Sequence, residues 1–258
     1  MVAGHTEAYP MPDILITDDG AIRTIRMNRL DKKNALTLDM YEAMAEAIGT
    51  AATDNAIKCL LIAGGPNVFC AGNDIGDFMK AAGSGSLGQP ILNFLYALAR
   101  CEKPIVAAVN GNAVGVGTTM LLHCDYVVAG HETKLSTPFV ALGLVPEAAS
   151  SLVAPRLMGH ARAFSLLVMG QPLSAQEAKD AGIVNAVCAA EETEAQALAA
   201  AQRIAALPAQ GVLVSRRLMR GTPDEIIARI DEEAEAFKAR LQSPDAQAAF
   251  MAFMSRKR

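Results

Sequence analysis

Residues 104–125 of this 258-residue chain read PIVAAVNGNAVGVGTTMLLHCD, and this stretch decides the fold. Its first part, residues 104–122, carries no charge and approaches the length of a membrane span. Pro104, Asn110, Asn112 and three glycines interrupt that apolar run. The segment therefore predicts a buried strand over residues 105–109, a glycine turn, and a buried helix from about residue 118 to residue 123, not a membrane helix.

The segments on either side of this stretch continue an alternation of strands and helices. The pattern predicts a hairpin of residues 14–17 and 21–27 around Asp18-Asp19-Gly20, a helix after Thr37, a buried strand over 59–63, a helix over 88–100 and a strand over 126–128. Such alternation is typical of α/β proteins, in which helices connect the parallel strands of a sheet. The fold class predicted from the residues is therefore α/β.

The composition changes to helix-forming residues from about residue 191. Helices are predicted over residues 191–206, 209–219, 223–242 and 244–255, separated by Pro208, by Gly221-Thr222-Pro223 and by Ser243-Pro244. We place the boundary between a core, residues 1–195, and a C-terminal helical region, residues 196–258. The acidic helix at 223–242 is expected to present a solvated face.

Charge and cysteine content exclude several classes of function. The net charge is −4 and basic residues cluster only at the last few positions, so nucleic acid is not an expected partner. The five cysteines are odd in number and no pair has metal-ligand spacing, which favours reduced thiols in the cytoplasm and no bound metal. The first residues lack the basic start and apolar stretch of a signal peptide.

Three short segments together contain the groups expected of one active site. They are FCAGNDI at residues 69–75, NGNAVGVGTT at 110–119, and the run from TPF at 137–139 to VPE at 145–147. Gly72 and Gly115 allow tight turns that free main-chain N–H groups, and two N–H groups aimed at one carbonyl oxygen make an oxyanion hole. We take the N–H groups of Ala71 and Val116 as the candidate donors. Glu147 adds a single carboxylate, which could move a proton on a carbon next to that carbonyl.

Each of these features also has an ordinary structural interpretation. A glycine turn between a strand and a helix is common on its own. Glu147 could simply begin the helix expected at residues 151–158, where the helix dipole favours an acidic side chain. Asn73 is expected to support its loop through its side chain, and Asp74 to cap the helix that follows.

The sequence motifs of the chain resemble those of the crotonase superfamily, the enoyl-CoA hydratase/isomerase group. The matching segments are NRLDKKNAL at 28–36, FCAGNDI at 69–75, PIVAAVNGNAVGVGTTMLLHCD at 104–125, residues 135–159, and GQPLSAQEAKDAGIVNAV at 170–187. The resemblance implies a spiral of ββα units, with C-terminal helices that support assembly into a homotrimer or a dimer of trimers. It also implies an acyl-CoA thioester as substrate, held by the N–H groups of Ala71 and Val116.

The resemblance further implies where coenzyme A would bind. Its nucleotide part would lie near Lys33, Ala35 and Leu36. The remaining contacts would come from Ala71, Gly72, Asn73, Asp74 and Ile75. Coenzyme A arrives as part of the substrate, so no separate cofactor is expected. A small loop at residues 83–86, GSGS, is placed where a ligand tail could pass.

Two departures from the family pattern point to the reaction. Hydratases of this family use two glutamates, at positions that here hold Thr119 and Phe139. Glu147 instead matches the proton-shuttling glutamate of the peroxisomal-type Δ3,Δ2-enoyl-CoA isomerases. Isomerisation needs only one such group, because the proton removed from C2 of a 3-enoyl-CoA can return at C4 on the same face.

Other functions stay open at this point. Within the family, the alternatives are a hydratase-like enzyme and another crotonase-type reaction such as thioester hydrolysis, with Glu147 activating water. Outside enzymes, the chain could be a non-catalytic acyl-CoA-binding or scaffold protein that retains the pocket.

Overall fold

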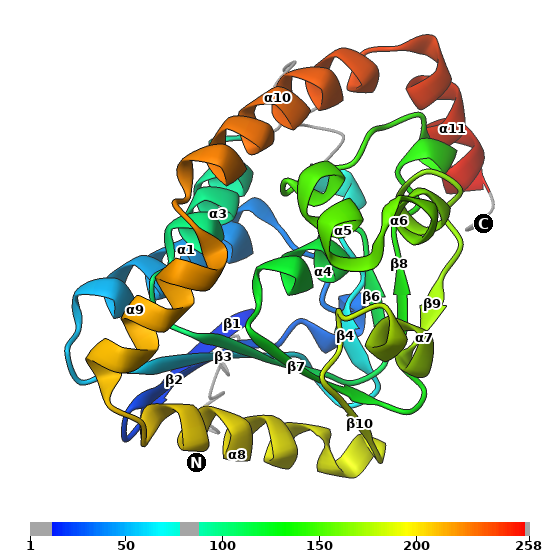
Figure 1. Cartoon of the computed structure of the whole chain (residues 1–258). Coiled ribbons are helices and arrows are strands. Elements are labelled where there is room, and N and C mark those ends of the chain that lie inside the picture. The colour runs from blue at the N-terminus through cyan, green and yellow to red at the C-terminus, as the bar shows by residue number, and fades with distance from the viewer. Residues whose placement is uncertain (1–11, 78–87, 256–258) are drawn as a thin grey trace, which may run out of the picture.

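The computed structural model describes residues 12–77 and 88–255, arranged around two β-sheets (Figure 1). The larger sheet has six strands in the order β1-β2-β3-β5-β7-β10. Their bounds are β1 Ile14–Asp19, β2 Ile22–Met27, β3 Cys59–Ala63, β5 Ile105–Val109, β7 Tyr126–Gly130 and β10 Ala186–Cys188. The predicted hairpin is confirmed as the antiparallel pair β1–β2, and the remaining pairs of this sheet are parallel.

A smaller sheet of four strands has the order β4-β6-β8-β9. These strands are β4 Val68–Cys70, β6 Asn112–Val114, β8 Lys134–Ser136 and β9 Leu173–Ser174. The chain passes three times from the larger sheet to the smaller one, through β3–β4, β5–β6 and β7–β8, and helices follow each passage. The expected spiral of ββα units is therefore confirmed, as is the α/β class.

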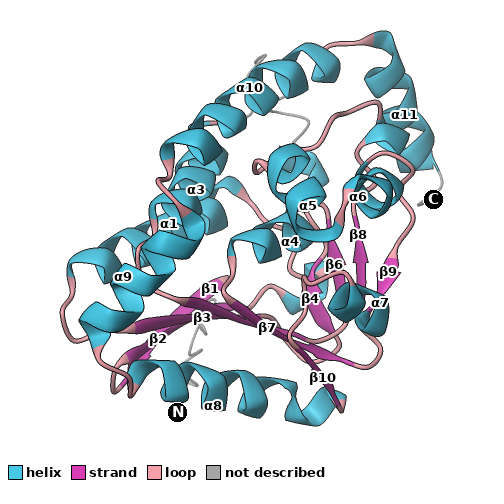
Figure 2. Cartoon of the chain, viewed as in Figure 1, coloured by secondary structure: helices cyan, strands magenta, loops and turns pink. Residues whose placement is uncertain are grey.

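Helices surround the two sheets (Figure 2). The α-helices are α1 Leu38–Thr53, α3 Gln89–Arg100, α4 Val116–Thr119, α5 Ser150–Met158, α6 His160–Leu167, α7 Ala175–Asp180, α8 Thr193–Ala205, α9 Ala209–Arg220, α10 Asp224–Leu241 and α11 Pro244–Ser255. Short 3-10 turns are η1 Leu30–Lys32, η2 Met120–His123, η3 Val140–Leu142 and η4 Ala190–Glu192. The helix expected near residues 118–123 thus begins earlier, at Val116, and continues as a 3-10 turn. The loop expected at residues 83–86 lies outside the described residues.

The larger sheet is covered on both faces, which explains its continuous apolar strands. Leu61, Val106 and Val128 pack against alanines of α8 in one apolar cluster. The residues that alternate with them, such as Ile62 and Val127, belong to the main core together with α1 and α3. Helix α8 lies along the face of the sheet opposite to α4, α5 and α10 (Figure 1).

The last two helices fold back over the core of the same chain. Helix α10 contacts α3, and α11 contacts η3. The approach at η3 is close, because a methyl group added to Gly143 would lie 2.7 Å from the Ala246 nitrogen. The boundary at residue 195 and the role of the C-terminal region in assembly stay predictions. Within one chain, however, the C-terminal region contacts residues 139–151 directly.

The helices of the described residues give only weak evidence of a membrane span. Within the described ranges no single helix combines the length and apolar character that a membrane span needs. Residues Ala190–Ala205 and Ala209–Arg220 meet the criterion together, by length and composition only, as a pair bent by 106°.

Candidate active site

Glu147 lies in the loop before α5, and its side chain is buried among apolar neighbours. The residue is 8% exposed, and nearby Phe139 is buried as well. The pKa of Glu147 is raised to about 8. Burial is the main cause and raises it, a hydrogen bond from Thr119 lowers it, and the negative charge of Glu233 adds a smaller increase. A carboxyl group with this pKa can both accept and return a proton near neutral pH.

Thr119 provides the polar partner of this carboxyl group. Its hydroxyl donates a hydrogen bond to Glu147 Oε1. The neighbouring Thr118 instead bonds to main chain, with its hydroxyl 2.7 Å from the Ala113 carbonyl oxygen. Because Thr119 ends the short helix α4, the carboxyl group is tied to the helix that begins with Val116.

The turn before α4 presents the N–H of Val116. Gly115 has φ 56° and ψ −120°, a conformation that residues with a Cβ rarely adopt. This turn makes Val116 the first residue of the helix, where N–H groups have no acceptor within the helix. Among the described residues, no acceptor is found for the Val116 N–H. The Val116 N–H is therefore unpaired in the fold, and its role as an oxyanion donor stays a prediction.

Ala71 was the other predicted donor, and here the prediction is wrong. The Ala71 N–H donates a hydrogen bond to the carbonyl oxygen of Lys33, at 3.0 Å. An amide that is already paired within the fold is not free to bind a thioester oxygen. Another amide of the same turn would have to supply this donor.

Asn73, two residues further on, has the free N–H instead. The main chain of Leu36 bonds to the Gly72 carbonyl and to the Asp74 N–H, both at 2.8 Å. In a parallel ladder this pattern turns the N–H of the intervening residue, Asn73, toward the opposite edge. That edge faces β6, since β4 pairs with β6, and the Asn73 N–H has no acceptor in the described parts of the chain.

The two glycine turns lie against each other. A methyl group added to Gly72 would lie 3.1 Å from the Val114 carbonyl oxygen. One added to Gly117 would lie 2.8 Å from the Cys70 carbonyl oxygen. This close approach places Asn73 and Val116, each with an unpaired N–H group, on adjoining segments.

The side chains around the first turn are held by hydrogen bonds. The Tyr41 hydroxyl donates to Asn73 Oδ1, which confirms that the asparagine side chain supports its loop. Asp74 accepts from the Gly76 N–H at 2.9 Å and pairs with Arg29, as expected of a helix cap. Burial raises the pKa of Tyr41 well above its usual value and the pKa of Cys70 to about 12, and in both cases the nearby charge of Glu147 contributes. Tyr41 and Cys70 are thus neutral neighbours of Glu147.

The residues predicted to contact coenzyme A come together along one seam. Lys33, Ala35 and Leu36 lie beside residues 71–74, joined by the three main-chain bonds described above. Lys33 and Asn34 both adopt left-handed conformations, with φ of 54° and 53°. Whether Ala71, Gly72, Asn73, Asp74 and Ile75 hold the nucleotide with them stays a prediction.

Glu233 of α10 is a residue near the site that the sequence interpretation missed. It was assigned to a solvated acidic face, but it is 6% exposed and bonds to the loop that follows Glu147. A signal was present in the sequence. Ile230, Glu233, Phe237 and Leu241 are all buried and follow the helical period, so Glu233 occupies an apolar-face position.

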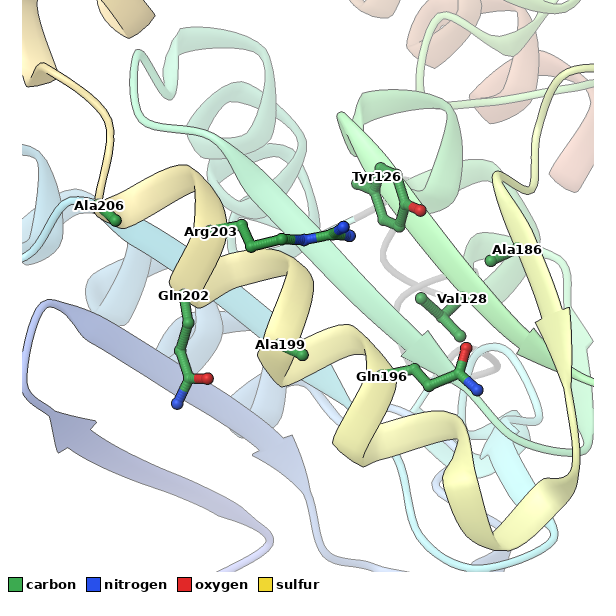
Figure 3. Close-up of a pocket in the computed structure, with 8 residues that line it drawn as sticks. All are labelled: Tyr126, Val128, Ala186, Gln196, Ala199, Gln202, Arg203 and Ala206. Atoms are coloured by element: carbon green, nitrogen blue, oxygen red, sulfur yellow. The ribbon is translucent and has the colours of Figure 1, made fainter.

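A pocket elsewhere on the molecule is separate from this site (Figure 3). It has a volume of about 570 Å³ and lies between α8 and the ends of β7 and β10. Tyr126 and Val128 line it from β7, and Gln196 and Arg203 line it from α8. Because Val128 faces α8 and not the core that contains Val116 and Phe139, this pocket is on the opposite side of the sheet from Glu147.

Comparisons with known proteins agree with the fold. Residues 17–258 match the model of the enoyl-CoA hydratase/isomerase family. The chain therefore belongs to the enoyl-CoA hydratase/isomerase family, the crotonase superfamily, whose members act on acyl-CoA thioesters.

Individual relatives carry several different activities in their names. The chain is 34% identical to enoyl-CoA delta isomerase 2 of Rattus norvegicus over 97% of its own length and 66% of that protein. It is 29% identical to the 1,2-epoxyphenylacetyl-CoA isomerase of Escherichia coli, covering 96% of this chain and 97% of that protein. It is 33% identical to the enoyl-CoA hydratase AFT3-1 of Alternaria alternata, covering 93% and 83%.

Solved structures confirm the fold at higher identity. Pseudomonas aeruginosa OdaA superposes with a TM-score of 0.90 at 43% identity, covering 95% of this chain and 99% of that one. An enoyl-CoA hydratase/isomerase from Pseudoalteromonas atlantica gives a TM-score of 0.90 at 36% identity, covering 95% and 98%.

Proposed function

We propose that this enzyme is a Δ3,Δ2-enoyl-CoA isomerase that uses Glu147 as its single proton-transferring group. The observation that carries the proposal is the isolation of this carboxyl group. It is buried, its pKa is raised to about 8, and the two positions where hydratases of the family have glutamates hold Thr119 and Phe139. The similarity to the rat delta isomerase supports the same reaction.

The reaction would proceed by removal of one proton and return of one proton through the same carboxyl group, which can exchange its proton with solvent between the two steps. The Glu147 carboxylate accepts a proton from C2 of a 3-enoyl-CoA, and the electron pair moves into the C1–C2 bond, which places negative charge on the thioester oxygen. Protonated Glu147 then returns the proton at C4, and the double bond comes to lie between C2 and C3. No oxidation occurs, so the reaction needs no redox cofactor.

The N–H groups of Asn73 and Val116 would hold the thioester oxygen during this step. Each donor in an oxyanion hole contributes about 3 kcal/mol to stabilising the charge. The general base contributes about another 10²–10⁴-fold in rate. Coenzyme A would enter as part of the substrate along the seam formed by Lys33, Leu36 and residues 71–75.

An assay with two substrates tests the proposal. Wild type should convert a 3-enoyl-CoA to the 2-enoyl-CoA, and should form no 3-hydroxyacyl-CoA from a 2-enoyl-CoA. Exchange of solvent deuterium at C2 and C4 should be lost in Glu147→Gln, with a fall in kcat of about 10²–10⁴-fold. Formation of the 3-hydroxy product would favour a hydratase, and release of free coenzyme A would favour a hydrolase.

The same assay addresses the non-enzymatic alternative. Tight acyl-CoA binding without turnover, unchanged in Glu147→Gln, would indicate a binding protein.

Assembly into a trimer or dimer of trimers is proposed on the family resemblance. Helix α9 exposes Leu218 and Met219, which supports packing of further copies on this helix. Sedimentation of the purified protein measures the assembly directly.

A further inference from the structure

The loop that carries Glu147 contains an unusual turn directly after it. Ala148 and Ala149 both have left-handed main-chain conformations, with φ of 62° and 54°. For residues with a Cβ such a conformation is strained, and it persists only where surrounding contacts enforce it. The turn therefore needs an anchor, and its geometry determines where the Glu147 side chain points.

Glu233, from the distant helix α10, supplies that anchor. Its Oε2 accepts from the Ala149 N–H at 2.6 Å, and its Oε1 accepts from the N–H of Ser151 at 2.9 Å and from the Ser151 hydroxyl at 2.5 Å. Helix α5 has no capping side chain of its own at its N-terminus. The Glu233 carboxylate thus serves as a cap supplied from another helix, at a helix end that favours negative charge.

Helix α10 also holds the other end of the same loop. Arg240 Nε donates to the Gly143 carbonyl oxygen at 3.1 Å. Glu147 therefore lies between two attachments to α10, one at Gly143 and one at Ala149. On the core side, His123 Nε2 lies 2.8 Å from the Ala148 carbonyl oxygen.

From this geometry we infer that Glu233 is a positioning residue for Glu147: it holds the left-handed turn that aims the catalytic carboxyl group. Its negative charge also raises the pKa of Glu147, as a smaller effect than burial. The inference rests on the proposed role of Glu147 in proton transfer. Helix α10 would then help to position the active-site carboxyl group of its own chain, a role separate from any role in assembly.

The inference can be tested by measuring how kcat/KM depends on pH, because most titratable groups around Glu147 do not change charge near neutral pH. Burial raises the pKa of Tyr41 and Cys70, from α1 and β4, and lowers the pKa of His123, from η2, to about 4. These three groups stay neutral between about pH 6 and pH 9. Burial also raises the pKa of Glu233, whereas hydrogen bonds from Ser151 and Ala149 and the charge of Arg229 lower it; Arg229 also donates to the Ser151 hydroxyl at 3.2 Å. Because Glu233→Gln removes the titration of Glu233, a rising limb of kcat/KM that persists in this variant reports Glu147.

The test compares Glu233→Gln with wild type in the isomerase assay. The glutamine keeps the shape of the side chain but removes the charge and one of the two acceptor oxygens. We expect kcat at neutral pH to fall about 10–100-fold, because the carboxyl group is misplaced. We also expect the midpoint of the rising limb to move toward lower pH by about half a unit or more, because a neighbouring negative charge is gone. A merely structural role would leave that midpoint unchanged.

A rescue and a matched control complete the design. Adding Ala149→Gly to Glu233→Gln removes the cost of one left-handed alanine and should restore part of kcat without restoring the midpoint. If Glu233→Gln alone does not fold, the same midpoint comparison is made between Ala149→Gly and the double variant. Glu225→Gln is the control, because Glu225 also joins α10 to α5, through an exposed pair with Arg156 at 2.6 Å. It should leave both kcat and the midpoint unchanged.

The outcomes separate this inference from the proposed function. If Glu147→Gln is inactive while Glu233→Gln has wild-type kcat and midpoint, the positioning role is overturned and the isomerase proposal stands. If Glu147→Gln retains full activity, the isomerase proposal itself fails.

Discussion

The hydroxyl of Thr119, at the end of α4, donates a hydrogen bond to the carboxylate of Glu147, in the loop before α5. This bond joins the two halves of the candidate site, since α4 begins with the free Val116 N–H. It also favours the ionised form of Glu147, against the effect of burial. The resemblance to hydratases places a glutamate where this chain has Thr119. Here Thr119 instead lowers the pKa of the Glu147 carboxyl group.

Thr119→Val should therefore shift the activity profile toward higher pH. Without the hydroxyl, the carboxylate loses a donor and its pKa rises, so kcat/KM at pH 7 should fall several-fold while the plateau at high pH is reduced less. The measurement is kcat/KM from pH 6 to pH 10. Thr118→Val is the control, because the Thr118 hydroxyl bonds to the Ala113 carbonyl instead; it should cost stability but leave the midpoint in place.

Glu147 should also make the fold less stable as the pH rises. Its pKa in the folded protein is raised, so its contribution to stability is fully present below the unfolded pKa near 4.5 and is lost as pH rises through about 8. Each pH unit crossed in that window costs about 1.4 kcal/mol. Urea unfolding at pH 6 and pH 9 should show that Glu147→Gln gains stability relative to wild type at the higher pH. A constant difference between the two proteins would contradict the buried, shifted carboxyl group.

Gly115→Ala should damage the site more than the fold. A methyl group at residue 115 meets only the Phe139 ring, at 3.9 Å, so the cost comes from the positive φ, on the order of 1–3 kcal/mol. Relaxing that strain would turn the Val116 N–H away, and kcat should fall. Gly221→Ala is a matched control, since Gly221 also has a positive φ, of 73°, with nothing within 4 Å of an added methyl group. It should lose similar stability by thermal unfolding and keep kcat.

Replacing single main-chain amides with esters distinguishes the two candidate donors of the first turn. An ester at residue 73 removes the N–H that lacks an acceptor, and kcat should fall about 10²-fold or more. An ester at residue 71 breaks only the bond to the Lys33 carbonyl, so stability should fall by about 1 kcal/mol with kcat retained. The opposite pattern would restore Ala71 as the oxyanion donor.

The sequence predicted the parts of the fold that depend on local patterns. The apolar run 105–109, the Thr37 cap at 3.2 Å from the Met40 nitrogen and the helices after residue 191 all follow from residues close together in the chain.

The features that were missed depend on contacts between distant segments. The pairing of Ala71 with Lys33 and the anchoring of Ala149 by Glu233 join residues 38 and 84 positions apart. A glycine turn indicates that some amide is free, but only the neighbouring strand determines which one. An acidic residue on a helix is normally solvated, and only its position on the apolar face of α10 distinguishes Glu233.

The attachment of Glu233 to the Ala149 turn has a consequence for protein synthesis. Helix α10 follows the Ala149 turn by many residues, since Glu233 lies 84 positions after Ala149. During synthesis the strands and turns of the site therefore leave the ribosome before α10 does. The Glu147 carboxyl group will be correctly aimed only after α10 has emerged and docked on this turn.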